Sequence, residues 1–212
     1  MKWELVKHLD KIRDTVTEVG RIVSSHRYPE DRRTVFVMGL LATMTQHHQS
    51  ALQLLKSGAV ASSYALTRDL VRAMRYGLWI NACATEEQIL RLERGEEFPL
   101  SIPEMTKEVE AAYSADPFFD RLKNRWGSQL TNYSLSGVFQ LGRWEIDASS
   151  GLHRDDEKIR DVTTIATLCI VILAAKFVAS QKHPVDCKQI EVLAANTIPS
   201  ASISEDSVRP TS

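Results

Sequence analysis

The fold is decided by residues 35–83, which read VFVMGLLATMTQHHQSALQLLKSGAVASSYALTRDLVRAMRYGLWINAC. Apolar residues recur in this stretch at intervals of three and four, the spacing of one face of an α-helix. The pattern predicts two long helices, the first ending near Lys56 and the second running from Ala59 to Ala82. Gly58 follows the last regular turn, where glycine ends a helix by adopting the left-handed conformation at low cost. A link this short predicts that the two helices are antiparallel neighbours.

Further helices are predicted on both sides of this pair. Trp3 to Val23 has the same apolar spacing and predicts an amphipathic helix of about six turns. Glu157 to Gln181 predicts the most apolar helix, which His183-Pro184 ends. Shorter helices are predicted from capping sequences and local patterns between these long ones, beginning at Thr85, Ser101, Asp116 and Gly137.

The fold class follows from this order of elements. No segment shows the alternation of a strand, so we predict an all-α protein, an antiparallel helical bundle of four long helices with several short inserted helices. The chain has 212 residues, 43% of them hydrophobic and 25% charged, which is enough for one substantial core. We expect one domain over residues 1–195 and a disordered tail over residues 196–212.

Charge and cysteine content narrow the function classes. A formal net charge of -1 gives no overall field that would attract nucleic acid or an anionic membrane. The three cysteines lack metal-ligand spacing, so they indicate neither a zinc site nor a disulfide framework. No metal site and no cofactor are predicted from the sequence motifs. The N-terminus has no signal-peptide pattern, and the apolar residues 162–179 are interrupted by threonines and a lysine, as in a buried core helix. We therefore expect a cytoplasmic protein without a membrane partner.

Two adjacent histidines, His47 and His48, are the first candidates for chemistry. His48 falls on the apolar face of its helix and His47 one step beside it. They would serve as a base or as metal ligands, but neither Glu-x-x-His nor His-x-x-x-His occurs on this helix, and adjacent side chains point about 100° apart. We favour the alternative of a core histidine that is hydrogen-bonded to a neighbour.

Arginines repeat at intervals of four and three along the second helix, at Arg68, Arg72 and Arg75. This face lies nearly opposite the apolar line of the helix, so a solvated face is one interpretation. Trp79 falls on the same face, and a tryptophan is costly to leave in water. The four residues are therefore a candidate binding surface for a protein partner, for phosphate or for stacked bases.

Two further polar pairs are candidates. Gln140 and Arg143, one helical turn apart, join the paired histidines as a possible polar cluster. Arg21 and His26 fit the Arg-x4-6-His spacing of HEPN-type ribonucleases, in which these residue types act on the ribose hydroxyl and phosphate, but this chain holds enough arginines and histidines for about one such match by chance. Glycine-rich phosphate loops and nucleophile-triad motifs are absent from the sequence.

Several short motifs resemble an uncharacterised family of bacterial helical proteins that is distantly similar to HEPN-type bundles. The family pattern has paired histidines on one helix, then Arg-Pro-Leu-x-Glu leading to Gly-Leu-Trp on the next, then Thr-His-Gly-Gly-x-x-Gln-x-x-Arg. The corresponding residues here are His47-His48, Arg68-Asp69-Leu70-Val71-Arg72 with Gly77-Leu78-Trp79, and the segment from Ser134 to Arg143.

Three positions depart from that pattern. Asp69 replaces the proline, Arg72 replaces the glutamate and Leu135 replaces the histidine. Leucine cannot do the acid–base work of an imidazole. The resemblance therefore implies the bundle fold more than it implies an activity.

The function that we predict is a non-catalytic or degenerate bundle protein that forms a homo-oligomer or binds a protein partner. A defence or toxin–antitoxin setting is suggested by analogy alone. One alternative is an HEPN-like, metal-independent ribonuclease or nucleotide-modifying domain, with His48 as base and Arg68 or Arg143 holding phosphate. A second alternative is a small-ligand sensor with a pocket between the two helices of residues 35–83. Nucleic acid is a weaker candidate partner than protein.

Overall fold

The computed structural model describes residues 3–97, 99–113 and 156–197, and this part of the chain forms helices without any strand. The helices in chain order are α1 (Trp3–Ser24), α2 (Arg32–Ser57), α3 (Val60–Ala82), α4 (Glu86–Glu93), α5 (Ile102–Tyr113), α8 (Asp156–Ser180) and α9 (Pro184–Thr197). The all-α prediction is confirmed. The predicted helices that begin at Asp116 and Gly137 lie outside the described residues.

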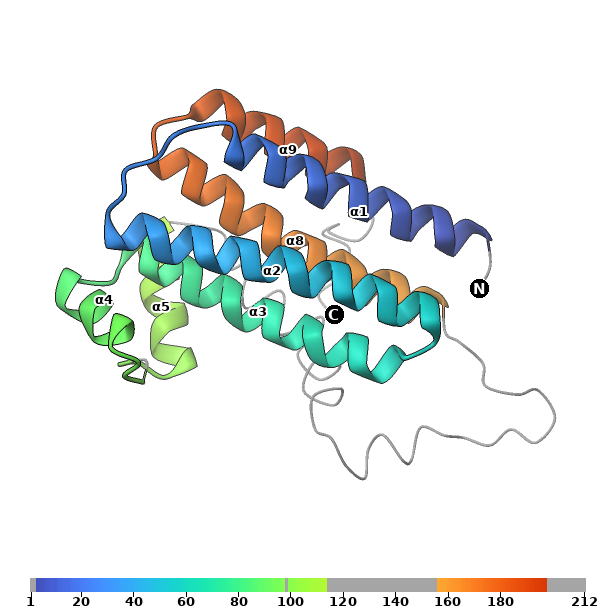
Figure 1. Cartoon of the computed structure of the whole chain (residues 1–212), viewed down its shortest axis with the longest axis horizontal. Helices are drawn as coiled ribbons and strands as arrows, with labels where there is room; N and C mark the ends of the chain where they lie inside the picture. Colours follow the sequence, from blue (N-terminus) through green and yellow to red (C-terminus); the bar gives the residue numbers. More distant parts are fainter. Residues whose placement is uncertain (1–2, 98, 114–155, 198–212) are drawn as a thin grey trace, which may run out of the picture.

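The long helices form a bundle around α8 (Figure 1). Helix α8 contacts α1 and α9 on one side and α2 and α3 on the other. Residues Ile159–Ser180 of α8 are long and apolar enough to cross a membrane, but 78% of the most apolar window is buried inside the bundle. This burial agrees with the sequence prediction of a buried core helix.

Helices α2 and α3 form the predicted antiparallel pair (Figure 1). Asp31 caps the start of α2, where its side chain accepts a hydrogen bond from the Thr34 backbone N–H at 2.9 Å. Gly58 ends the helix with φ 95°, in the left-handed region. The apolar line predicted for α2 is buried throughout, at Val37, Leu41, Met44, His48, Ala51 and Leu55.

Capping sequences also place the two short helices. Thr85 and Gln88 form a reciprocal capping box at the start of α4, in which the Thr85 hydroxyl accepts from the Gln88 N–H and the Gln88 amide oxygen accepts from the Thr85 N–H. Ser101 and Glu104 repeat this device before α5, where the Glu104 carboxylate accepts from the Ser101 N–H at 2.9 Å. Both starts were predicted from the sequence.

Helix α9 is not among the predicted helices, because His183-Pro184 predicts only the end of the preceding helix. Proline is also favoured in the first turn of a helix, where its missing N–H costs no hydrogen bond. Helix α9 packs on α1 and α8, buries Ile190 and extends to Thr197. The hydroxyls of Thr197 and Thr15 lie 2.6 Å apart in the interior, so the packed chain reaches past the predicted boundary at residue 195.

Gly77 allows α3 to approach α8 closely. A Cβ atom built on Gly77 would lie 2.5 Å from Cδ2 of Leu173, which is fully buried. We therefore expect Gly77→Ala to lower the free energy of unfolding by about 1–3 kcal/mol through overpacking. The matched control is Gly20→Ala on α1, where nothing lies within 4 Å of the added methyl and helix propensity raises stability by up to about 1 kcal/mol. Urea denaturation followed by circular dichroism measures both, and changes of the same sign would contradict the packing argument.

Candidate functional site

His48 lies in the core of the bundle, in contact with α8. Its side chain is fully buried, and its Nε2 lies 3.0 Å from the hydroxyl of Thr167. That hydroxyl donates its own hydrogen to the backbone carbonyl of Thr163 at 2.8 Å, so it accepts from an Nε2–H of His48. Burial lowers the pKa of His48 to about 4, which keeps the imidazole neutral at pH 7. The core-histidine interpretation is confirmed.

This position conflicts with the catalytic role considered for His48. A general base must come within hydrogen-bond reach of the proton that it removes. The imidazole of His48 is enclosed by the core, and its neighbour His47 is only half-buried on the adjacent side of α2. Arg72 on α3 is exposed whereas His48 is enclosed, so these two side chains do not form one exposed site.

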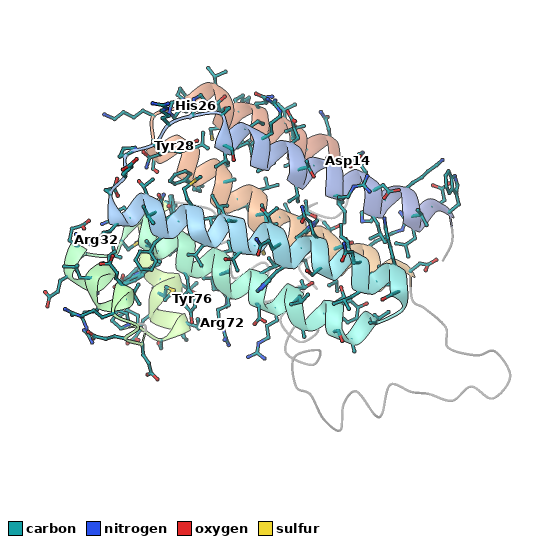
Figure 2. All side chains as sticks on the ribbon, viewed as in Figure 1. Asp14, His26, Tyr28, Arg32, Arg72 and Tyr76 are labelled. Carbon is teal, nitrogen blue, oxygen red and sulfur yellow. The ribbon has the colours of Figure 1, made fainter. Side chains whose placement is uncertain are left out.

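The arginine series of α3 is less uniform than its spacing suggests. Arg72 is exposed and projects from the edge of α3 (Figure 2). Arg68 and Arg75 are half-buried, and burial lowers the pKa of Arg75 while the nearby Cys169 thiol opposes this effect. Of these three arginines, only Arg72 is therefore an exposed residue.

Trp79 is not part of an exposed binding surface, and the prediction that it faces outward with the arginines is wrong. Its side chain is fully buried, and its indole N–H donates to the carboxylate of Glu108 at 2.7 Å. Helix α5 contacts α3 and supplies Glu108, so the face that periodicity assigned to solvent is covered there by a later helix. Together with Gly77 and the buried Leu78, Trp79 joins α3 to α5 and α8.

The remaining predicted residues do not form a site in the described part of the chain. Gln140 and Arg143 lie outside the described residues. Arg21 pairs with Glu18 at 2.6 Å, whereas His26 lies 2.6 Å from the carboxylate of Asp186 on α9. The two residues of the HEPN-like spacing thus have separate acidic partners.

The outer side of α2 is a further candidate surface that is not among those predicted from the sequence. Residues 34–55 contain no aspartate, glutamate, lysine or arginine. The uncharged face consists of the exposed residues in this range, which are Val35, Gly39, Ala42, Thr43, Gln46, Gln49, Ser50 and Gln53. By contrast, the exposed side of α1 includes Lys7, Lys11, Arg13, Asp14 and Arg21. The absence of charged residues is visible in the sequence, but only the structure shows which of these side chains are exposed.

The uncharged face consists of small residues and glutamine amides. A Cβ atom built on Gly39 would have nothing within 4 Å. Small side chains allow another helix to approach closely, and amides can donate and accept hydrogen bonds across such a contact. The face therefore has the chemistry of a contact surface and lacks groups for acid–base catalysis.

A second polar cluster lies where α1 ends and α9 begins. His26 is in the link between α1 and α2, His183 is in the link between α8 and α9, and Asp186 is in the first turn of α9. The rings of His26 and His183 are stacked with centroids 4.1 Å apart, and Tyr28 lies edge-on to both. Figure 2 labels His26 and Tyr28 at this end of the bundle. Sequence spacing does not predict this cluster, because its histidines lie near opposite ends of the chain.

Comparison with known protein families gives a match over most of the chain. Residues 41–191 match the model of a family of unknown function, DUF6988. The matched range includes most of α2, all of α3 and α8, and the first half of α9. No curated protein and no solved structure matches the chain.

Proposed function

Because the chain belongs to DUF6988, a family of unknown function, we propose its role from its own geometry: it is a non-catalytic helical module that self-associates through the uncharged face of α2. The proposal includes a reducing, cytoplasmic setting, in which Cys83, Cys169 and Cys187 remain free thiols.

The absence of charge from an exposed helix face is the observation that supports this role. The buried centres of protein interfaces are depleted in charged residues, whereas an ordinary solvent-facing helix surface is rich in them. Helix α1 follows the ordinary pattern, with charges along its exposed side. The exposed side of α2 from Val35 to Gln53 has no charged residue. An interface explains this difference between two long helices of the same bundle.

A second copy of the chain is the partner that this face suits best. In a two-fold dimer the same patch lies on both sides of the interface, so any strongly charged patch meets like charges. An uncharged face avoids that repulsion. The open space above Gly39 and the small neighbours Ala42 and Thr43 leave room for the helix of the second copy.

The proposed interface therefore lies on α2 and not on α3, the helix that the arginine spacing favours. Trp79 lies in the core and therefore does not contribute to a contact surface on α3. Arg72 remains exposed, but a single guanidinium group gives a weaker reason for self-association than a face of eight uncharged residues. A catalytic role gains no support from His48, because its imidazole is fully enclosed.

A matched pair of threonine substitutions tests the proposal. Thr43 and Thr17 are both exposed helical residues whose hydroxyls donate to the carbonyl four residues earlier, at 2.9 Å in each case. We expect wild-type protein to show twice the mass of one chain, and Thr43→Glu to weaken the dimer by about tenfold or more, since each copy adds a negative charge to the interface. Thr17→Glu, on the charged side of α1, should leave the association unchanged.

Sedimentation equilibrium over a range of protein concentrations measures these effects. Wild-type protein that keeps the mass of one chain at every concentration would overturn the proposal, as would equal association of wild type and Thr43→Glu. Arg72→Ala serves as a second comparison, because loss of the dimer in that variant alone would assign the interface to α3 instead.

A further inference from the structure

We propose that His26, His183 and Asp186 form a binding site for a divalent transition-metal ion, with zinc as the ion that best matches their ligand atoms. The ion would join the link between α1 and α2 to the start of α9. This inference is independent of the proposed self-association, because it rests on residues at the end of the bundle.

The residue types suit such an ion. Two imidazoles and one carboxylate supply the nitrogen and oxygen ligands that zinc and related divalent ions accept in proteins. All three residues are half-buried, so the site is accessible without being fully solvated. Three protein ligands would leave a further coordination position for water.

The spacing of the ligand atoms is compatible with one ion. The candidate atoms all lie within 4.8 Å of one another, and the closest measured pair is His26 Nε2 and Asp186 Oδ2 at 2.6 Å. Neighbouring ligands of a tetrahedral zinc ion lie roughly 3.4 Å apart, given metal–ligand bonds of about 2.0–2.2 Å. The observed separations lie on both sides of this value. Small rotations of the two imidazoles, which sit on links rather than inside helices, would bring the ligands to that distance.

Two polar atoms at the cluster lack hydrogen bonds to the described residues. Among the described residues, His26 Nε2 is buried and makes no hydrogen bond, although it lies at ion-pair distance, 2.6 Å, from Asp186 Oδ2. The Tyr28 hydroxyl is likewise buried and unpartnered. Buried polar atoms without hydrogen bonds are costly, and a bound ion would give the His26 nitrogen a ligand bond in place of one.

A purely structural explanation covers only part of the cluster. A carboxylate in the first turn of a helix is favoured by the helix dipole, which accounts for Asp186 on α9. It does not account for two imidazoles stacked beside that carboxylate, drawn from two different links of the chain. A shared ion gives all three side chains one reason to converge.

Zinc binding to the full chain tests this site. Protein stripped with a chelator is titrated with zinc by calorimetry, and its melting temperature is measured with and without the ion. We expect one ion per chain and a rise in melting temperature of about 5 °C or more when free zinc exceeds its dissociation constant by roughly a hundredfold. His26→Ala and Asp186→Asn should each weaken zinc binding by at least about tenfold. Removal of a residue that only supports a metal ligand already lowers metal affinity by about 10–100-fold, so removal of a ligand should cost no less.

Two controls separate this site from adventitious binding. His47→Ala removes a half-buried histidine from α2 and should bind zinc as wild type does. Cys187→Ser, next to Asp186, should also retain binding, which excludes a thiolate ligand. Asp186→Asn preserves the shape of the side chain and decides the question if His26→Ala does not fold. Absence of zinc uptake by wild type, or equal affinity in wild type, His26→Ala and Asp186→Asn, would overturn the proposal.

Discussion

Replacing Trp79 by alanine is expected to lower the free energy of unfolding by about 3–5 kcal/mol, the range for removing a buried aromatic side chain. The indole is fully buried and belongs to the main core cluster, which includes α3, α5 and α8. Its N–H also donates to Glu108, so the substitution leaves that carboxylate without this hydrogen bond. Urea denaturation followed by far-UV circular dichroism measures the loss as a lower midpoint.

Two other substitutions make this result specific. Trp3→Ala removes the same side chain from a position that is 67% exposed, so it should change stability by less than about 0.5 kcal/mol. Trp79→Phe keeps an aromatic ring but loses the hydrogen bond to a charged group, a loss of about 1.5–3 kcal/mol. If Trp79→Ala instead unfolded like wild type and changed only the oligomeric state, Trp79 would be an interface residue and its placement in the core would be wrong.

The antiparallel pair of α2 and α3 was predictable because its determinants are local. Apolar residues at intervals of three and four set the buried face of α2, and Gly58 follows the last turn in the left-handed conformation that only a few residue types adopt easily. The capping sequences at Thr85 and Ser101 are local in the same way. Such features depend on neighbours in the sequence and therefore survive into the folded structure.

The environment of Trp79 was not predictable from α3 alone. Helical periodicity assigns each residue to a face, but it does not say which other helix covers that face. Helix α5, which begins after an intervening short helix, contacts α3 and places Glu108 against the indole. The only sign of this packing in the sequence is a tryptophan on a helix face that periodicity assigns to solvent. Exposure of such a side chain to water would be unfavourable, and burial under another helix avoids it.

The two sites proposed here differ in what the sequence could reveal. The lack of charge between residues 34 and 55 is a one-dimensional signal, although exposure is what makes it informative. The cluster of His26, His183 and Asp186 has no such signal, because α9 was not predicted and the first histidine comes from the opposite end of the chain. Metal sites assembled from distant segments lack the short ligand spacings by which sequence motifs are found.

Acidification is expected to destabilise the protein through His48. The pKa of its buried imidazole is lowered from 6.5 to about 4, because burial disfavours the charged form. Between these two values the unfolded chain binds a proton that the folded chain excludes, so the free energy of unfolding falls as the pH falls. This contribution is fully present above about pH 6.5 and is lost progressively down to about pH 4, for a total of about 3 kcal/mol. His8, whose pKa is also lowered to about 4 by burial, adds to the same trend.

Substitution of His48 separates its contribution from that of the carboxylates, which titrate in an overlapping range. His48→Gln removes the titrating group while its amide can still donate to the Thr167 hydroxyl. Denaturation at several values between about pH 7.5 and about pH 4.5 should show a smaller loss of stability in this variant than in wild type, by an amount approaching 3 kcal/mol. His47→Gln, one residue away and only half-buried, should retain the wild-type pH dependence because it leaves His48 in place. Parallel profiles for wild type and His48→Gln would mean that the core admits a charged imidazole, which complete burial against Thr167 should prevent.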